Sequence, residues 1–286
     1  MSLNVAQEIQ GLDTIVTRTL FTGETSGQPA LSPDDYEHRF LETIADAVRS
    51  LQAPQAIVPD DLLNDPQRLM RYFGVEAVTH SFFAKMFPSY LMNVAAKCPF
   101  QDVRREIIED CYCEEVNDPD AGDISHIDVL YRDGETLGIS REEAEGMQPS
   151  LVMMLCMHTL DNLSKILPWQ AGYATTGGLE AIQIAIKRGY LTREEFSGRY
   201  PPAEIERLCQ LPDGSLRNLR LHAMKDQQHG SGVLTILRKY ATNREIQEMT
   251  FWAVKLARQI RVLTWREQRR LARAAVGLPY DTLEVV

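Results

Sequence analysis

The sequence predicts an all-α protein, a single bundle of about seven to nine helices. Apolar residues recur at spacings of three and four over long stretches, which is the period of an amphipathic helix. The alternation of apolar and polar residues that is typical of strands is missing at any length. Proline, glycine and capping residues divide the chain into segments of helical length. A composition of 44% hydrophobic and 24% charged residues is that of an ordinary globular protein.

The chain is expected to hold one domain. Residues 1–32 are interpreted as a loosely ordered lead-in, because the stretch 22–29 is rich in glycine, threonine, serine and proline. Residues 33–286 are then a single helical domain, since no repeat or low-complexity segment interrupts them.

In the first half of the domain, four helical segments follow one another. The first begins after Ser32, and a second begins at Asp65 and runs to about Cys98, with a possible break near Gly74. A third covers residues 102–116, and a fourth covers residues 124–137 after a turn rich in aspartate.

In the second half, capping residues mark the predicted helix starts. Ser140 begins a capping box for a short connecting helix, and Ser150 begins an apolar helix expected to be buried on most sides. A helix over residues 175–189 follows, then a helix capped by Ser215 and a final helix from Asn243 to about residue 275.

Charge and cysteine content narrow the class of protein. A net charge of −10 and a pI near 5.2 argue against a nucleic-acid partner, which would require a basic surface. Five cysteines without framework spacing indicate reduced thiols, and no signal peptide is evident. The longest apolar run, residues 151–157, is far shorter than the roughly 20 residues of a membrane span. We therefore expect a cytoplasmic protein without a membrane partner.

The most informative motif is an H-x-x-x-D-x-x-H sequence in the helix expected after Ser215. It places His222, Asp226 and His229 at positions i, i+4 and i+7, so the second and third lie roughly 40° and 20° to either side of the first around a helix. Three side chains that can bind a metal therefore share one stripe. A solvated, salt-linked stripe is the alternative interpretation.

Further candidate ligands lie at three other places in the sequence. Glu114 and Glu115 end one predicted helix, and His126 begins the next. Glu180 lies in an apolar stretch, where an unpaired charge would be costly, so we expect a cationic or metal partner for it. Mixed imidazole and carboxylate ligands suit iron or manganese, and six of them are enough for two ions. Which of the two adjacent glutamates is the ligand stays open.

The order of these residues resembles that of the haem-oxygenase-like diiron oxidase family, within the wider superfamily of haem oxygenase, thiaminase II and pyrroloquinoline-quinone synthase. The resemblance covers roughly residues 35–265 and matches Glu114 or Glu115, His126, Glu180, His222, Asp226 and His229 to that family's ligands. Two departures are a long loop between Glu115 and His126 and a proline-rich extension before His222.

The resemblance implies a core of about seven helices without haem, two Fe(II) ions and O2 as co-substrate. It implies oxidation of a small molecule, an amine or amino-acid-like compound, by N-oxygenation, desaturation or oxidative C–C cleavage, typically in natural-product biosynthesis. The alternatives are a cofactorless oxidase, a thiaminase-like hydrolase with a cysteine nucleophile, and a non-catalytic helical protein that binds iron or a partner.

Other histidines and arginines are given structural interpretations. His80 and His158 lie in apolar helices and are expected to be core or cavity residues. A row of arginines near the C-terminus is interpreted as a solvated face or a subunit contact, which leaves a homodimer open; it comprises Arg258, Arg261, Arg266, Arg269, Arg270 and Arg273.

Overall fold

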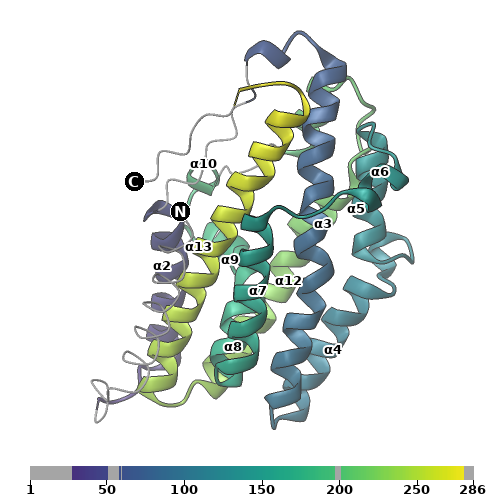
Figure 1. Cartoon of the computed structure of the whole chain (residues 1–286). Helices are drawn as coiled ribbons and strands as arrows, with labels where there is room; N and C mark the ends of the chain where they lie inside the picture. The colour runs from purple at the N-terminus through teal and green to yellow at the C-terminus, as the bar shows by residue number, and fades with distance from the viewer. Residues whose placement is uncertain (1–27, 51–57, 59, 197–200, 280–286) are drawn as a thin grey trace.

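A computed structural model describes residues 28–50, 58, 60–196 and 201–279 (Figure 1). These described residues form helices and no strand, with one isolated bridge between Asp118 and Ile124. The predicted all-α class is therefore confirmed. The proposed lead-in lies almost entirely outside the described residues, and its interpretation stays a prediction.

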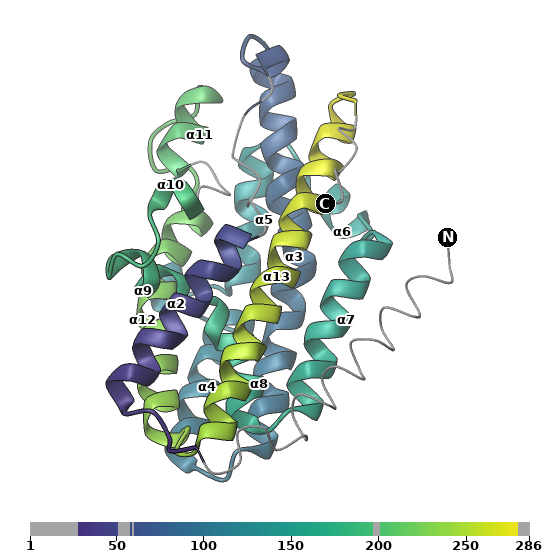
Figure 2. The same ribbon diagram turned by 90° about the vertical axis from the view of Figure 1, so that its left-hand side faces the viewer.

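Two long helices form the centre of the bundle. α3 (Pro66–Lys97) runs down and α13 (Arg244–Ala275) runs back up in Figure 1. α13 packs against α3 and also against α2 (Pro33–Ser50), α7 (Leu151–Ile166) and α8 (Trp169–Thr176), and Figure 2 shows α2 lying across its outer side.

The predicted break near Gly74 is wrong, because α3 is continuous there. A Cβ atom at this position would lie 2.7 Å from Ile139 Cγ1, so the glycine permits close packing inside an unbroken helix.

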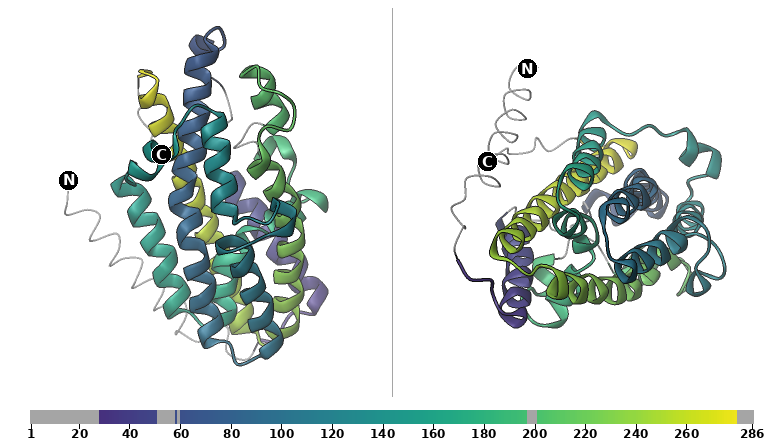
Figure 3. Two further views of the ribbon diagram at one scale, coloured as in Figure 1. Left: turned by 90° about the vertical axis from the view of Figure 1, so that its right-hand side faces the viewer. Right: turned by 90° about the horizontal axis from the view of Figure 1, so that it is seen from below.

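A second set of elements carries the candidate site. α4 (Gln101–Glu115) and α5 (His126–Thr136) lie beside α3, and α12 (Arg217–Tyr240) packs against both of them (Figure 3). The remaining elements are short: η1 (Asp60–Leu62), η2 (Pro119–Ala121), α6 (Arg141–Gly146), η3 (Gly177–Leu179), α9 (Ile182–Lys187), α10 (Arg193–Phe196) and α11 (Pro202–Leu208).

Three of the predicted helix starts, including the predicted cap at Ser140, are capped by side-chain hydrogen bonds. The side chains of Ser140, Ser150 and Asn243 accept from the backbone N–H three residues on. The predicted cap at Ser215 is wrong, since its hydroxyl donates to the Pro212 carbonyl instead. The first N–H groups of α12 are capped by a residue of another helix. The buried carboxylate of Asp133 in α5 accepts from the backbone N–H groups of residues 217 and 218 at 2.9 and 3.0 Å.

The apolar faces of α2, α3, α8 and α13 form the main core, with residues such as Phe40, Ile44, Tyr90, Val94 and Val254 fully enclosed. α7 differs from its prediction, because only one face is buried and Leu151, Leu155 and Ile166 are exposed. His158 on this helix is exposed as well, which corrects its assignment to the core. None of the described helices combines the length and the apolar character that a membrane span needs.

Candidate metal centre

Six side chains form two groups in which each residue offers one metal-ligating atom. The first group is Glu114, His126 and His222, and the second is Asp110, Glu180 and His229. Within each group the three candidate atoms lie within 4.8 Å of one another. The residues come from α4, α5, α12 and the short segment between η3 and α9. The structure thus brings five sequence-predicted residues together with one that was not predicted, Asp110.

α4 supplies one carboxylate to each group. Asp110 and Glu114 are four residues apart, so they lie on one face of the helix, and both are buried. Burial raises the pKa of Glu114, but the hydrogen bond and charge of His126 and the nearby His222 outweigh it, so the pKa lies below its usual value. Glu115 points the other way and is exposed. Of the two adjacent glutamates, Glu114 is therefore the one placed to bind a metal.

His126 is held from both sides. Its Nδ1 donates to Glu114 Oε1 at 2.9 Å and its Nε2 donates to Asp118 Oδ2 at 2.7 Å. Asp118 is fully buried and also lies 3.2 Å from Lys225 Nζ. A carboxylate behind a histidine fixes the orientation of its ring, as in many metal sites. His126 Nδ1 therefore faces the first group, and Asp118 acts as its support.

His229 lies between two carboxylates. Its Nε2 is 3.5 Å from Asp110 Oδ1, and its Nδ1 is 3.4 Å from Glu180 Oε1. Burial lowers the pKa of His229, but Glu180, Asp110 and Glu114 raise it more, to about 10. Burial raises the pKa of Asp110 to about 8, with His229 opposing and Glu180, Glu106 and Glu114 adding to the rise. In the second group, Asp110 and His229 therefore keep their protons at neutral pH.

Glu180 is not inside a helix, contrary to the prediction of one helix over residues 175–189. The chain changes from α8 to the 3-10 turn η3 and then to α9, and Glu180 follows directly after η3. This segment is pressed onto α12 at Gly230, where a Cβ atom would lie 2.9 Å from the Glu180 carbonyl oxygen. Because Gly230 follows His229, the close approach of the two backbones places Glu180 beside the His229 ring.

Asp226 lies outside both groups, although it is on the same helix. Its carboxylate lines a cavity and its charge acts on Arg258 of α13. The charge of Asp226 favours the charged form of Arg258, and the prediction that Asp226 binds a metal stays a prediction.

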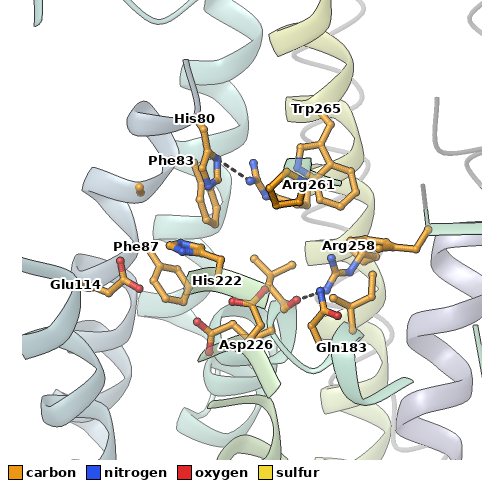
Figure 4. Close-up of a pocket in the computed structure, with 16 residues that line it drawn as sticks. His80, Phe83, Phe87, Glu114, Gln183, His222, Asp226, Arg258, Arg261 and Trp265 are labelled. Carbon is orange, nitrogen blue, oxygen red and sulfur yellow. Dashed lines mark hydrogen bonds between the residues drawn. The ribbon is translucent and has the colours of Figure 1, made fainter. Parts of the chain in front are cut away.

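The cavity, of about 210 Å³, opens next to both groups (Figure 4). Glu114 and His222 line one side of it, and Arg258 and Arg261 of α13 line the other; Glu180 lines it as well. Both arginines are buried, which corrects their assignment to a solvated face or subunit contact. The helix turns Arg258 and Arg261, three residues apart, to the same inward face. His80 also lines the cavity, in agreement with its predicted role.

The sequence carried one unused signal for Asp110. Glu106, Asp110 and Glu114 recur every four residues and so form an acidic stripe along one helix face. Asp118 gave no such signal, because it lies in a turn with other aspartates and only the fold shows that it is buried against His126.

No protein-family model matches the sequence, and no curated protein matches it significantly. Solved structures do resemble its fold. A domain of unknown function with a haem oxygenase-like fold from Shewanella denitrificans OS217 has a TM-score of 0.53 at 11% identity, over 94% of this chain and 93% of that one. The chain has a haem-oxygenase-like fold.

Two further structures share this fold. A CADD-like protein of unknown function from Nostoc punctiforme PCC 73102 has a TM-score of 0.53 at 18% identity, over 85% of this chain and 100% of that one. A TenA homolog from Pseudomonas syringae pv. tomato DC3000 has a TM-score of 0.53 at 15% identity, over 87% and 96% of the two chains. At these identities the likeness concerns the fold, and the chemistry has to be argued from the side chains.

Proposed function

We propose that this protein is a non-haem diiron enzyme that uses O2 to oxidise a small molecule. The observation that carries the proposal is the pair of groups of buried and half-buried side chains, with three carboxylates and three histidines between them, beside one cavity. Helical bundles commonly bind two iron ions in this way, between carboxylates and histidines that project inward from several helices.

The residues fit two divalent ions in their chemistry and in their charge. Imidazole and carboxylate together suit iron and manganese, whereas calcium prefers oxygen ligands alone. Burial raises the pKa of Asp110, and the neighbouring carboxylates of Glu180, Glu106 and Glu114 add to the rise; a bound cation would favour the charged form of this group. Glu114, His126 and His222 would hold one ion, and Asp110, Glu180 and His229 the other.

The chain's own side chains have separate tasks around this centre. When bound, two ferrous ions supply the electrons that O2 needs. Asp118 keeps the His126 ring aimed at the first group. Phe83, Phe87 and Leu179 give the cavity apolar walls, which limit the access of water to a bound substrate.

The cysteines argue against a hydrolase with a cysteine nucleophile. All five are free, and the described lining of the cavity includes none of them. Burial raises the pKa of Cys111 and Cys209 to about 12 and that of Cys156 to about 11, so these groups are thiols at neutral pH. A thiol is a poor nucleophile compared with a thiolate.

An anaerobic titration of the metal-free protein with Fe(II), followed by admission of O2, tests the proposal. The wild type is expected to bind two ions per chain and to give a transient absorption band with O2. Glu180→Gln should bind only one ion tightly and lose the band. Glu115→Gln, an exposed change beside Glu114, should behave like the wild type. A wild type that binds no iron, or a Glu180→Gln variant that matches it, would refute the proposal.

A further inference from the structure

Arg258 is a charged side chain enclosed in the bundle; the charge of Asp226 acts on it, and one of its donors is not used within the described part of the chain. It is 1% exposed and lines the cavity, where its Nη2 donates to the Leu179 carbonyl. Its Nε is buried and has no hydrogen-bond partner among the described residues. A buried guanidinium is costly unless its donors are paired, so an acceptor in the cavity would stabilise it.

Arg261 is fixed in place by its neighbours. Its guanidinium carbon lies 4.2 Å from the ring centre of Phe83 and 5.3 Å from that of Trp265. Its Nη1 donates to Thr264 Oγ1 at 2.9 Å and its Nη2 to His80 Nδ1 at 2.8 Å. Because a guanidinium only donates, His80 Nδ1 accepts, and its ring proton is on Nε2. The two aromatic rings and the two hydrogen bonds fix the position of this charge.

Trp265 lines the same cavity. Its Nε1 is buried and has no hydrogen-bond partner in the described part of the chain. Figure 4 shows Arg258, Arg261 and Trp265 together on α13, across the cavity from Glu114. Two arginines, opposed by the single carboxylate of Asp226, thus line the cavity from α13, and Glu114 and His222 line its other side.

We propose that the cavity takes a small organic acid, whose carboxylate is held by Arg258 and Arg261 and whose apolar part extends toward Glu114 and His222. This inference rests on the proposed function, which supplies the reaction, and it adds the chemical class of the substrate. The acidic side chains at the far end repel a second carboxylate, so the anion has one favourable orientation. A volume of about 210 Å³ is below the range of about 300–1,000 Å³ for sites of drug-sized ligands, which restricts the acid to a small one.

Binding of 3-phenylpropionate, compared with its neutral isostere 3-phenylpropanamide, tests the carboxylate anchor by calorimetry. We expect the acid to bind wild-type protein at least tenfold more tightly than the amide, in metal-free and in metal-loaded protein. Arg261→Gln and Arg258→Gln should each weaken binding of the acid by roughly tenfold or more and leave that of the amide unchanged. Arg266→Gln is the matched control, since Arg266 lies on the same helix but beside a separate surface depression with Leu151 and Leu263.

Thermal melting followed by circular dichroism checks that each variant is folded. If Arg258→Gln does not fold, Arg258→Lys replaces it, because lysine keeps the charge and loses the planar fork. Equal binding of the acid to wild type and Arg261→Gln overturns the inference. If the acid binds only when metal is present, and equally well in the variants, the ions hold the carboxylate; the diiron proposal then survives and this inference fails. If the protein binds no iron but binding of the acid still depends on the arginines, the diiron proposal fails and this inference survives.

Discussion

At the scale of single residues, Asp110 and His229 carry protons that a metal ion has to displace. The pKa of Asp110 is raised to about 8 and that of His229 to about 10, so both are largely protonated at pH 7 without metal. Metal ligands have to lose these protons, which links the affinity for the ion to pH. Because both groups release protons on binding, the affinity has to increase as pH rises toward these values.

We therefore predict that Mn(II) binding to the second group strengthens roughly ten- to hundredfold per pH unit between about pH 6 and pH 8, as one to two protons leave per ion. Calorimetry in buffers of different ionisation enthalpy measures both the affinity and the protons released. Asp110→Asn removes one titrating group, so its binding should be weaker and should release about one proton fewer. Binding that is independent of pH in the wild type would contradict the assignment of these two residues as ligands.

At the scale of elements, contact between the η3–α9 segment and α12 positions Glu180. Gly230→Ala would put a Cβ atom 2.9 Å from the backbone of Glu180 and Ala181, and backbone cannot move away as a flexible side chain can. We predict a loss of roughly 1–3 kcal/mol in the free energy of unfolding and weaker metal binding in the second group only. Denaturant unfolding and Mn(II) titration measure the two effects.

Gly146→Ala is the control for that substitution. Gly146 ends α6, has no positive φ and has no heavy atom within 4 Å of an added Cβ. Its replacement should leave stability and metal binding close to those of the wild type. If Gly230→Ala behaves in the same way, the close packing does not position Glu180.

The same contact shows how far sequence reasoning reaches. Local signals predicted the helices and their starts at Ser140, Ser150 and Asn243, because periodicity and capping act within a few residues. They failed at Ser215, whose helix is capped by Asp133, more than eighty residues away in sequence. They also failed over residues 175–189, because packing against α12 breaks that helix. Interactions between distant segments override local preferences in both cases.

For the candidate site, sequence reasoning selected residues that are unusual among their sequence neighbours. The histidines of α12 and Glu180 were noticed in this way, and the fold places them together with His126 and Glu114. Asp110 and Asp118 are acidic residues among other acidic residues, so only their burial distinguishes them. Arg258 and Arg261 belonged to a long basic row, and which of its members face inward depends on how α13 is rotated against α12 and α3.

At the scale of the whole molecule, the Asp110 carboxyl of the site costs stability until a cation is bound. Asp110, Glu114 and Glu180 are carboxylates gathered in the interior of the bundle. A carboxyl whose folded pKa is raised destabilises the protein increasingly as pH rises from its unfolded value of about 3.9 toward the folded one. For Asp110, with a folded pKa of about 8, most of this penalty is present at pH 7.

We therefore predict that Asp110→Asn changes stability in opposite directions with and without metal. Without metal at pH 7, the variant should melt a few degrees above the wild type, because the penalty of the buried carboxyl is removed. Fe(II), added anaerobically at a hundred times its Kd, should stabilise the wild type by about 2.7 kcal/mol per site and raise its Tm by roughly 5–10 °C.

The variant should gain less from the same Fe(II), so the order of the two melting temperatures is expected to reverse. Calcium is the control ion, since sites that contain imidazole bind it poorly, and it should leave both melting temperatures almost unchanged. A reversed order requires that Asp110 both destabilises the empty bundle and binds the ion. If Asp110→Asn lowers the Tm equally in both conditions, the residue contributes to the structure alone, and the acidic cluster on α4 has to be explained without a metal.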